Sequence, residues 1–136
     1  MTTKTRATAA VVDFITSTTY GDIPADALHI ARRCIADGLG VMLAGSTTPA
    51  SEILRAQVRE DGSRAEATTL GRDSFRTRAA SAALVNATAG HAHDYDDTQL
   101  STAADRIFGL LTHPTIPPLA ASLAVGERLG VSGRTM

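Results

Sequence analysis

The chain has 136 residues, of which 43% are hydrophobic and 20% are charged. This length suits a single domain with a modest core, and the composition is that of a globular protein rather than a disordered or fibrous one. Thirteen basic and fourteen acidic side chains lack the basic excess that binding to a phosphate backbone requires, which argues against nucleic acid as a partner. The apolar runs fall far short of the roughly 20 residues that cross a bilayer, so we expect no membrane partner either.

The single cysteine, Cys34, excludes an internal disulfide framework and suits a reducing compartment. The N-terminal residues "MTTKTRATAAVVDF" lack the long apolar region of a secretory signal. We therefore expect a cytoplasmic protein.

Helical periodicity predicts two helices at the start of the chain. The first should have one buried face, because its apolar positions recur at steps of three and four residues. These positions are Ala7, Val11, Phe14, Ile15 and Thr18. Tyr20 and Gly21 should end this helix, and Asp22 with Pro24 gives a start signal for a second one. The apolar stripe of the second helix is Leu28, Ala31, Cys34, Ile35, Leu39 and Met42.

Three glycines mark the second helix. Gly38 and Gly40 lie inside it, where each costs up to about 1 kcal/mol relative to alanine, so we interpret them as points where another helix comes close. Gly45 is expected to cap its C-terminal end.

A third helix is predicted from Pro49 to the turn signal at residues 61–62. The segment "EATTLG", residues 66–71, favours β structure but is short, and no strand pattern recurs often enough for a sheet. A fourth helix should span about residues 75–91, where its many alanines allow a neighbouring backbone to come close. The predicted fold class is therefore all-α, a helical bundle.

A fifth helix should run from Pro117 or Pro118 to Leu129, with Gly130 as its cap. After it, Ser132 is a good N-cap for another helix, yet the chain stops four residues later. We therefore expect residues 1–136 to be a partial helical domain from a truncated chain.

The stretch "GHAHDYDDTQ", residues 90–99, concentrates two histidines and three aspartates. It follows the alanine-rich helix, so His91 should still be helical while His93 and the aspartates enter a loop. Helix ends and loops on a rigid scaffold are common places for catalytic groups. Downstream, "LLTHPTIPP" places His113 just before the fifth helix, near its positive N-terminal end. Aspartate and histidine brought together would suit proton transfer near neutral pH.

Structural roles are open for the same residues. Asp96 and Asp97 could solvate a loop or cap a helix, and Thr98 could make only a local bond to the backbone. His113 could be a partly buried histidine that a backbone carbonyl satisfies. Metal binding needs an extended backbone, because two helical histidines two positions apart point to nearly opposite sides.

Three runs carry a resemblance to a known family. They are "CIADGLGVMLAGS" at residues 34–46, "ALVNATAGHAHDYDDT" at 83–98 and "THPTIPPLAASLAVGERLGVSG" at 112–133. In this order, with the pattern H-x-x-D-[YF]-D-D-T followed by T-H-P, the chain resembles the N-terminal part of the MmgE/PrpD family. That family includes 2-methylcitrate dehydratase, cis-aconitate decarboxylase and iminodisuccinate epimerase.

The resemblance implies an enzyme with a large helical domain and a smaller α/β lid domain, about three times as long as this chain. Such enzymes act on small polycarboxylates without a metal or organic cofactor, usually as homodimers. The motif assigns catalytic roles to Asp94, Thr98 and His113. Supporting contacts with substrate would come from His91, Asp97 and Arg106, although a solvated surface role is the simpler reading of Arg106.

The chain departs from the family pattern in two ways. The segment "QLSTAADRIFGLLT" between Thr98 and His113 is longer than in several dehydratase-type members, so the loop over the site can differ. The only lysine is Lys4, whereas family members use a lysine and a further histidine from later segments. The resemblance therefore implies that these residues hold only part of a site and that the isolated piece is inactive.

Three functions compete on this basis. The first is a lyase or isomerase of this family that dehydrates, decarboxylates or epimerises a small polycarboxylate. The second is a metal-dependent hydrolase that uses His91, His93 and Asp97. The third is a helical interaction module without enzymatic activity.

Overall fold

The computed structural model describes residues 7–99 and 112–136. In chain order these residues form α1 (Ala7–Ser17), the short 3-10 helix η1 (Tyr20–Asp22), α2 (Ala25–Gly45), α3 (Pro49–Glu60), β1 (Ala67–Thr68), β2 (Arg76–Thr77), α4 (Ala79–His91) and α5 (Ile116–Leu129). The fold is therefore all-α, as predicted, with one small hairpin. None of the helices in the described ranges is long and apolar enough to cross a membrane.

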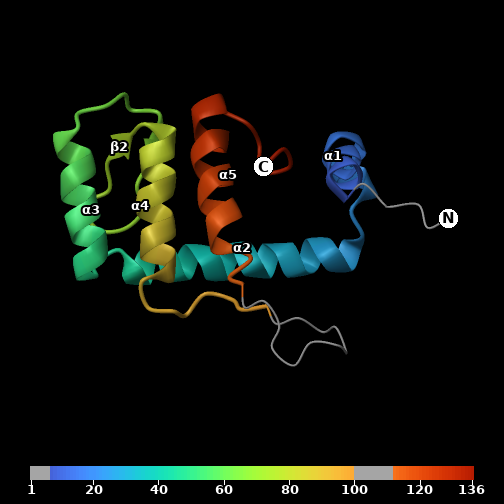
Figure 1. Cartoon of the computed structure of the whole chain (residues 1–136), viewed down its shortest axis with the longest axis horizontal. Coiled ribbons are helices and arrows are strands. Elements are labelled where there is room, and N and C mark those ends of the chain that lie inside the picture. Colours follow the sequence, from blue (N-terminus) through green and yellow to red (C-terminus); the bar gives the residue numbers. More distant parts are fainter. Residues whose placement is uncertain (1–6, 100–111) are drawn as a thin grey trace.

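The other described α-helices lie at the two ends of α2, three at its C-terminal part and one at its N-terminal end. Figure 1 shows α3, α4 and α5 standing side by side over the C-terminal part of α2, with α4 in the middle. The helix α4 packs against α2, α3 and α5. In contrast, α1 lies at the other end of α2 and contains no buried residue. The prediction of a helix over these residues is confirmed, but the predicted buried face is wrong for this structure.

The core lies where α2, α4 and α5 meet. Met42 from α2 is fully buried against a cluster on α5 that includes Ile116 and Leu119. A second buried cluster consists almost entirely of alanines, contributed by β1, α4 and α5: Ala67, Ala79, Ala82 and Ala124. These small side chains allow α4 and α5 to approach closely, as the alanine-rich sequence predicted.

Glycines set the contact between α2 and α4. A Cβ atom at Gly45 would collide with the backbone carbonyl of Ala89, and one at Gly90 would collide with Ile116. Gly45 is the last residue of α2, so it serves close approach rather than the predicted cap. Gly38 also faces a neighbour, the side chain of Leu119, whereas Gly40 has open space around it. The interpretation of Gly40 as a point of close approach is therefore wrong.

The fourth helix begins later than predicted. Residues 76–77 pair in antiparallel register with 67–68, so Ala67 faces Thr77 and Thr68 faces Arg76. This hairpin occupies the region that the periodicity assigned to the first turn of a helix, and α4 starts at Ala79. The fifth helix ends as predicted, because Gly130 adopts the left-handed conformation with φ 64° that glycine tolerates best.

Candidate functional site

The loop after α4 is shaped by a sharp reversal of the backbone. The helix ends at His91, and the amide of Asp94 donates a hydrogen bond of 3.0 Å to the carbonyl of His91. Asp94 itself is left-handed, with φ 56°, a conformation that aspartate tolerates better than most residues do. The reversal brings the carboxylate of Asp96 back beside the end of α4, where it contacts His91.

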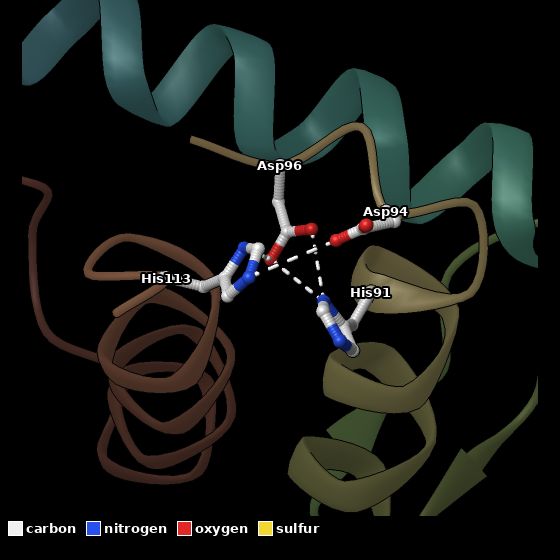
Figure 2. A group of neighbouring side chains, drawn as sticks. All are labelled: His91, Asp94, Asp96 and His113. Atoms are coloured by element: carbon white, nitrogen blue, oxygen red, sulfur yellow. Dashed lines mark hydrogen bonds and ion pairs between the residues drawn. The ribbon is translucent and has the colours of Figure 1, made fainter. Parts of the chain in front are cut away.

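Four side chains meet at this loop: His91, Asp94, Asp96 and His113 (Figure 2). Asp96 is the buried member, since its side chain is only 1% exposed. Its Oδ1 lies 3.0 Å from Nδ1 of His91, and its Oδ2 lies 3.2 Å from Nδ1 of His113. Figure 2 shows its carboxylate pointing between the two imidazoles. One buried carboxylate therefore faces two histidines from different elements.

The second carboxylate, Asp94, approaches the other nitrogen of His113. Nε2 of His113 lies 3.7 Å from Oδ1 of Asp94, whose side chain is 78% exposed. The rings of His91 and His113 are 4.6 Å apart at an angle of 69°. His113 is thus placed between a buried carboxylate and an exposed one, with both ring nitrogens directed at acidic groups.

Nδ1 of His113 has no aligned hydrogen bond among the described residues, although the atom is buried. The 3.2 Å separation from Asp96 Oδ2 is within the range of a hydrogen bond in length. The two atoms are therefore close enough for a hydrogen bond but are not aligned for one.

Asp97 holds the loop against the start of α5. Its Oδ1 accepts a hydrogen bond of 3.1 Å from the amide of Thr115, and its Oδ2 accepts one of 2.6 Å from the Thr115 hydroxyl. Thr115 is the N-cap residue of α5, where a carboxylate is favoured by free amides and by the helix dipole. The capping role that the sequence left open for Asp97 is confirmed, and both oxygens that we expected to reach substrate are engaged.

The other predicted site residues lie outside this cluster. Thr98 is exposed, beside the bridge in which the amides and carbonyls of Gln99 and Thr112 pair. His93 stacks on Tyr95, with ring centroids 5.3 Å apart. It is not one of the four residues whose ligand atoms come together, as the metal-hydrolase hypothesis required. Arg106 lies outside the described residues.

Sequence reasoning missed the importance of Asp96. The signal that could have found it is the spacing within "DYDD": in an extended backbone, side chains two apart share a face. In the structure Asp94 and Asp96 both approach His113, whereas Asp97 bonds to Thr115. The sequence analysis gave a catalytic role to Asp94 but only solvating or capping roles to Asp96, so this spacing was not used.

The cluster can support two kinds of chemistry. Imidazole and carboxylate in contact form an acid–base pair for proton transfer near neutral pH. The same four residues also present ligand atoms that all lie within 4.8 Å of one another, and imidazole with carboxylate suits several divalent metals. The cluster contains no thiol or hydroxyl nucleophile.

Fold and site together define an α-helical domain that carries an imidazole–carboxylate cluster where two of its helices meet. The sequence model of the MmgE/PrpD N-terminal domain matches residues 9–136. The chain therefore belongs to the MmgE/PrpD family, as the three sequence runs indicated, and it corresponds to the family's N-terminal domain. No curated protein and no solved structure matches the chain.

Proposed function

We propose that this domain supplies the acid–base half of the active site of an MmgE/PrpD-type lyase or isomerase that acts on a small polycarboxylate. The observation that carries the proposal is the position of His113, whose two ring nitrogens lie 3.2 Å from Asp96 and 3.7 Å from Asp94. Family membership supports the class of enzyme, and the choice among dehydration, decarboxylation and epimerisation is left to the substrate assay.

The roles follow from exposure. His113 is partly exposed, at 24% of its side chain, and Asp94 is largely exposed, so both can reach a bound molecule. In the proposed dehydration or epimerisation, Nε2 of His113 accepts a proton from the carbon next to a carboxylate of the substrate. Asp94, as the carboxylic acid, donates a proton to the hydroxyl group that leaves as water in dehydration, or to the carbanion in epimerisation. In decarboxylation the carbon that loses CO₂ takes the proton from Asp94.

The developing negative charge on the substrate needs cationic partners. Among the described residues, no arginine forms an ion pair with Asp94 or Asp96. The only lysine, Lys4, lies outside the described residues. The family resemblance implies a lysine from later segments, so we propose that residues outside this domain supply cations in addition to Arg106, within a homodimer.

The test is the replacement Asp94→Asn in the full-length protein, assayed with 2-methylcitrate, cis-aconitate and iminodisuccinate. The amide keeps the shape of the side chain but cannot exchange the proton, so turnover should fall about 100-fold or more. Asp13→Asn, on the exposed helix α1, is the matched control and should keep full turnover. Activity of Asp94→Asn within about threefold of the unchanged protein would remove Asp94 from the mechanism, because groups of this kind contribute more than that.

A metal-dependent reaction is the second candidate, since the four side chains have ligand atoms within 4.8 Å of one another. Exhaustive chelation should leave turnover unchanged if the site works by acid–base chemistry alone. Loss of activity on chelation, with recovery on adding a divalent ion, would instead favour the metal site. His93→Gln is the control that separates the cluster from the ligand set with His93 that the sequence suggested. Because His93 lies outside the cluster, this replacement should change neither turnover nor its response to chelation.

A further inference from the structure

The most unusual group in the cluster is the buried carboxylate of Asp96. Its side chain is 1% exposed, whereas that of Asp94, two residues earlier, is 78% exposed. Burying a carboxylate is costly unless donors compensate it. Among the described residues its partners are the two imidazoles. Nδ1 of His91 lies 3.0 Å from Oδ1 and 3.2 Å from Oδ2, and Nδ1 of His113 lies 3.2 Å from Oδ2. Each of these nitrogens offsets part of the cost of burying Asp96 if it carries a proton.

We propose that Asp96 is a positioning residue that fixes the tautomer of His113, with the proton on Nδ1 and an unprotonated Nε2. This inference rests on the proposed function, in which Nε2 is the proton acceptor. An ionised carboxylate only accepts hydrogen bonds, and a neutral imidazole carries one N–H. Because Asp96 faces Nδ1 of His113, the N–H is required there, and the lone pair remains on Nε2. The same argument places the N–H of His91 on Nδ1, since that atom also faces Asp96.

The neighbouring carboxylates cannot take over this role. Asp94 approaches only Nε2, at 3.7 Å, and is exposed enough for water to compete for its oxygens. Asp97 uses both oxygens on Thr115. The hydrogen bonds between Asp97 and Thr115 anchor the backbone two residues after His113, and they do not involve Asp96. Removing the charge of Asp96 should therefore release the tautomer of His113 while the start of α5 stays anchored.

Nδ1 of His113 is close to Asp96 but is not aligned with it. The atom is buried without an aligned hydrogen bond among the described residues, and a buried unsatisfied donor costs about 1–3 kcal/mol. The nearest acceptor is Asp96 Oδ2 at 3.2 Å. Catalytic hydrogen bonds are often poorly aligned before substrate binds and tighten afterwards. We expect the contact between Nδ1 of His113 and Asp96 to align when substrate binds.

The experiment reads the tautomers directly by long-range proton–nitrogen NMR on the full 136-residue chain with ¹⁵N-labelled histidine. Spectra are recorded at a pH where the imidazoles are neutral, and His91→Gln and His113→Gln assign the signals. His113 and His91 should show a protonated Nδ1 and an unprotonated Nε2. His29 and His93, both exposed, are internal references outside the contact with Asp96. A wild-type His113 that carries its proton mainly on Nε2 would overturn the proposal. The tautomers are read in the wild-type protein, and the two glutamine variants serve only to assign its signals.

The variant Asp96→Asn extends the test. Its amide can donate as well as accept, so the preference for Nδ1–H should be lost in His113, and the tautomers should mix. Unchanged tautomers in a folded Asp96→Asn protein would overturn the proposal. Asp96→Glu, which keeps the charge, should retain the wild-type tautomer better than Asn does.

Activity separates this inference from the proposed function. In the full-length enzyme Asp96→Asn should lower kcat about 100-fold or more, as loss of a histidine-orienting carboxylate does in hydrolases, with a much smaller change in KM. If Asp96→Asn were fully active and Asp94→Asn inactive, the positioning role of Asp96 would be overturned, but the proposed function would stand. Nδ1–H tautomers that depend on Asp96, in an enzyme without activity on any polycarboxylate, would uphold the tautomer assignment and contradict the proposed function.

Discussion

The two halves of α2 differ in what they contact, although both carry apolar residues at helical spacing. The C-terminal half contains all the buried residues of this helix: Gly38, Met42 and Gly45. These residues face α4 and α5. The N-terminal half has none, and Ile30 is 58% exposed. The same is true of α1, where Phe14 is 67% exposed, and Figure 1 shows that α1 lies beyond the reach of α3, α4 and α5.

This difference shows that an apolar stripe predicts a helix but not its burial. Burial requires a second element at the same place, and in the C-terminal half glycine and alanine allow that element to come close. The candidate site lies at this packed end, where α4 ends and α5 begins (Figures 1 and 2). The packed end of α2 therefore positions the histidines and aspartates, and α1 does not.

The largest expected change in the free energy of unfolding comes from removing a core side chain in the C-terminal half of α2. Met42 is fully buried, so Met42→Ala should lower the free energy of unfolding by about 2–5 kcal/mol, through lost burial and the cavity left behind. Phe14→Ala on α1 removes a larger but exposed side chain and should change it by less than about 0.5 kcal/mol. Urea unfolding followed by circular dichroism measures both. Equal losses would show that α1 is packed in solution.

A smaller effect, with opposite signs, is expected for two glycines of α2. Gly45→Ala forces a methyl group against the carbonyl of Ala89 and should destabilise the fold by about 1–3 kcal/mol. Gly40→Ala has open space around the new methyl group and should stabilise the helix by up to about 1 kcal/mol. The same urea experiment compares them. If both variants were destabilised alike, the close approach of α2 and α4 would not be the cause.

The smallest effect is a dependence of stability on pH. Burial opposes the ionisation of Glu127, but two hydrogen bonds from Thr68 and the nearby Arg76 guanidinium outweigh it, so its pKa lies below the ordinary glutamate value. A pKa that is lower in the folded state stabilises the fold above the unfolded pKa, and this contribution is lost as the pH falls through the folded pKa. Glu127→Gln should thus cost at most about 1 kcal/mol at neutral pH and nothing in acid.

A matched control for Glu127 is Asp22, in the short helix η1 between α1 and α2. Hydrogen bonds from the hydroxyl and the amide of Thr19 lower the pKa of Asp22, but they lie within one turn of the chain. Thr68, in contrast, is 59 residues from Glu127 in sequence. Asp22→Asn should therefore change the unfolding curve at neutral pH less than Glu127→Gln does. The reverse order would show that the local turn matters more than the link between β1 and α5.

Much of the fold could be predicted from the sequence because its signals are local. Helical periodicity, a proline at the start of α3 and a glycine after α5 depend on neighbours a few residues apart. These signals gave the all-α class and each helix to within a few residues. The hairpin of residues 67–68 and 76–77 was missed, because two-residue strands are too short for an alternating pattern.

By itself, the sequence determined the helices, the family and the presence of histidines and aspartates beside one another at residues 91–97 and at 113. Only the tertiary structure decided which of these side chains meet. It buries Asp96 between His91 and His113, turns Asp97 onto Thr115 and leaves His93 against Tyr95. The reason is that helix formation depends on contacts three or four residues apart, whereas the environment of a carboxylate depends on elements that only packing brings together.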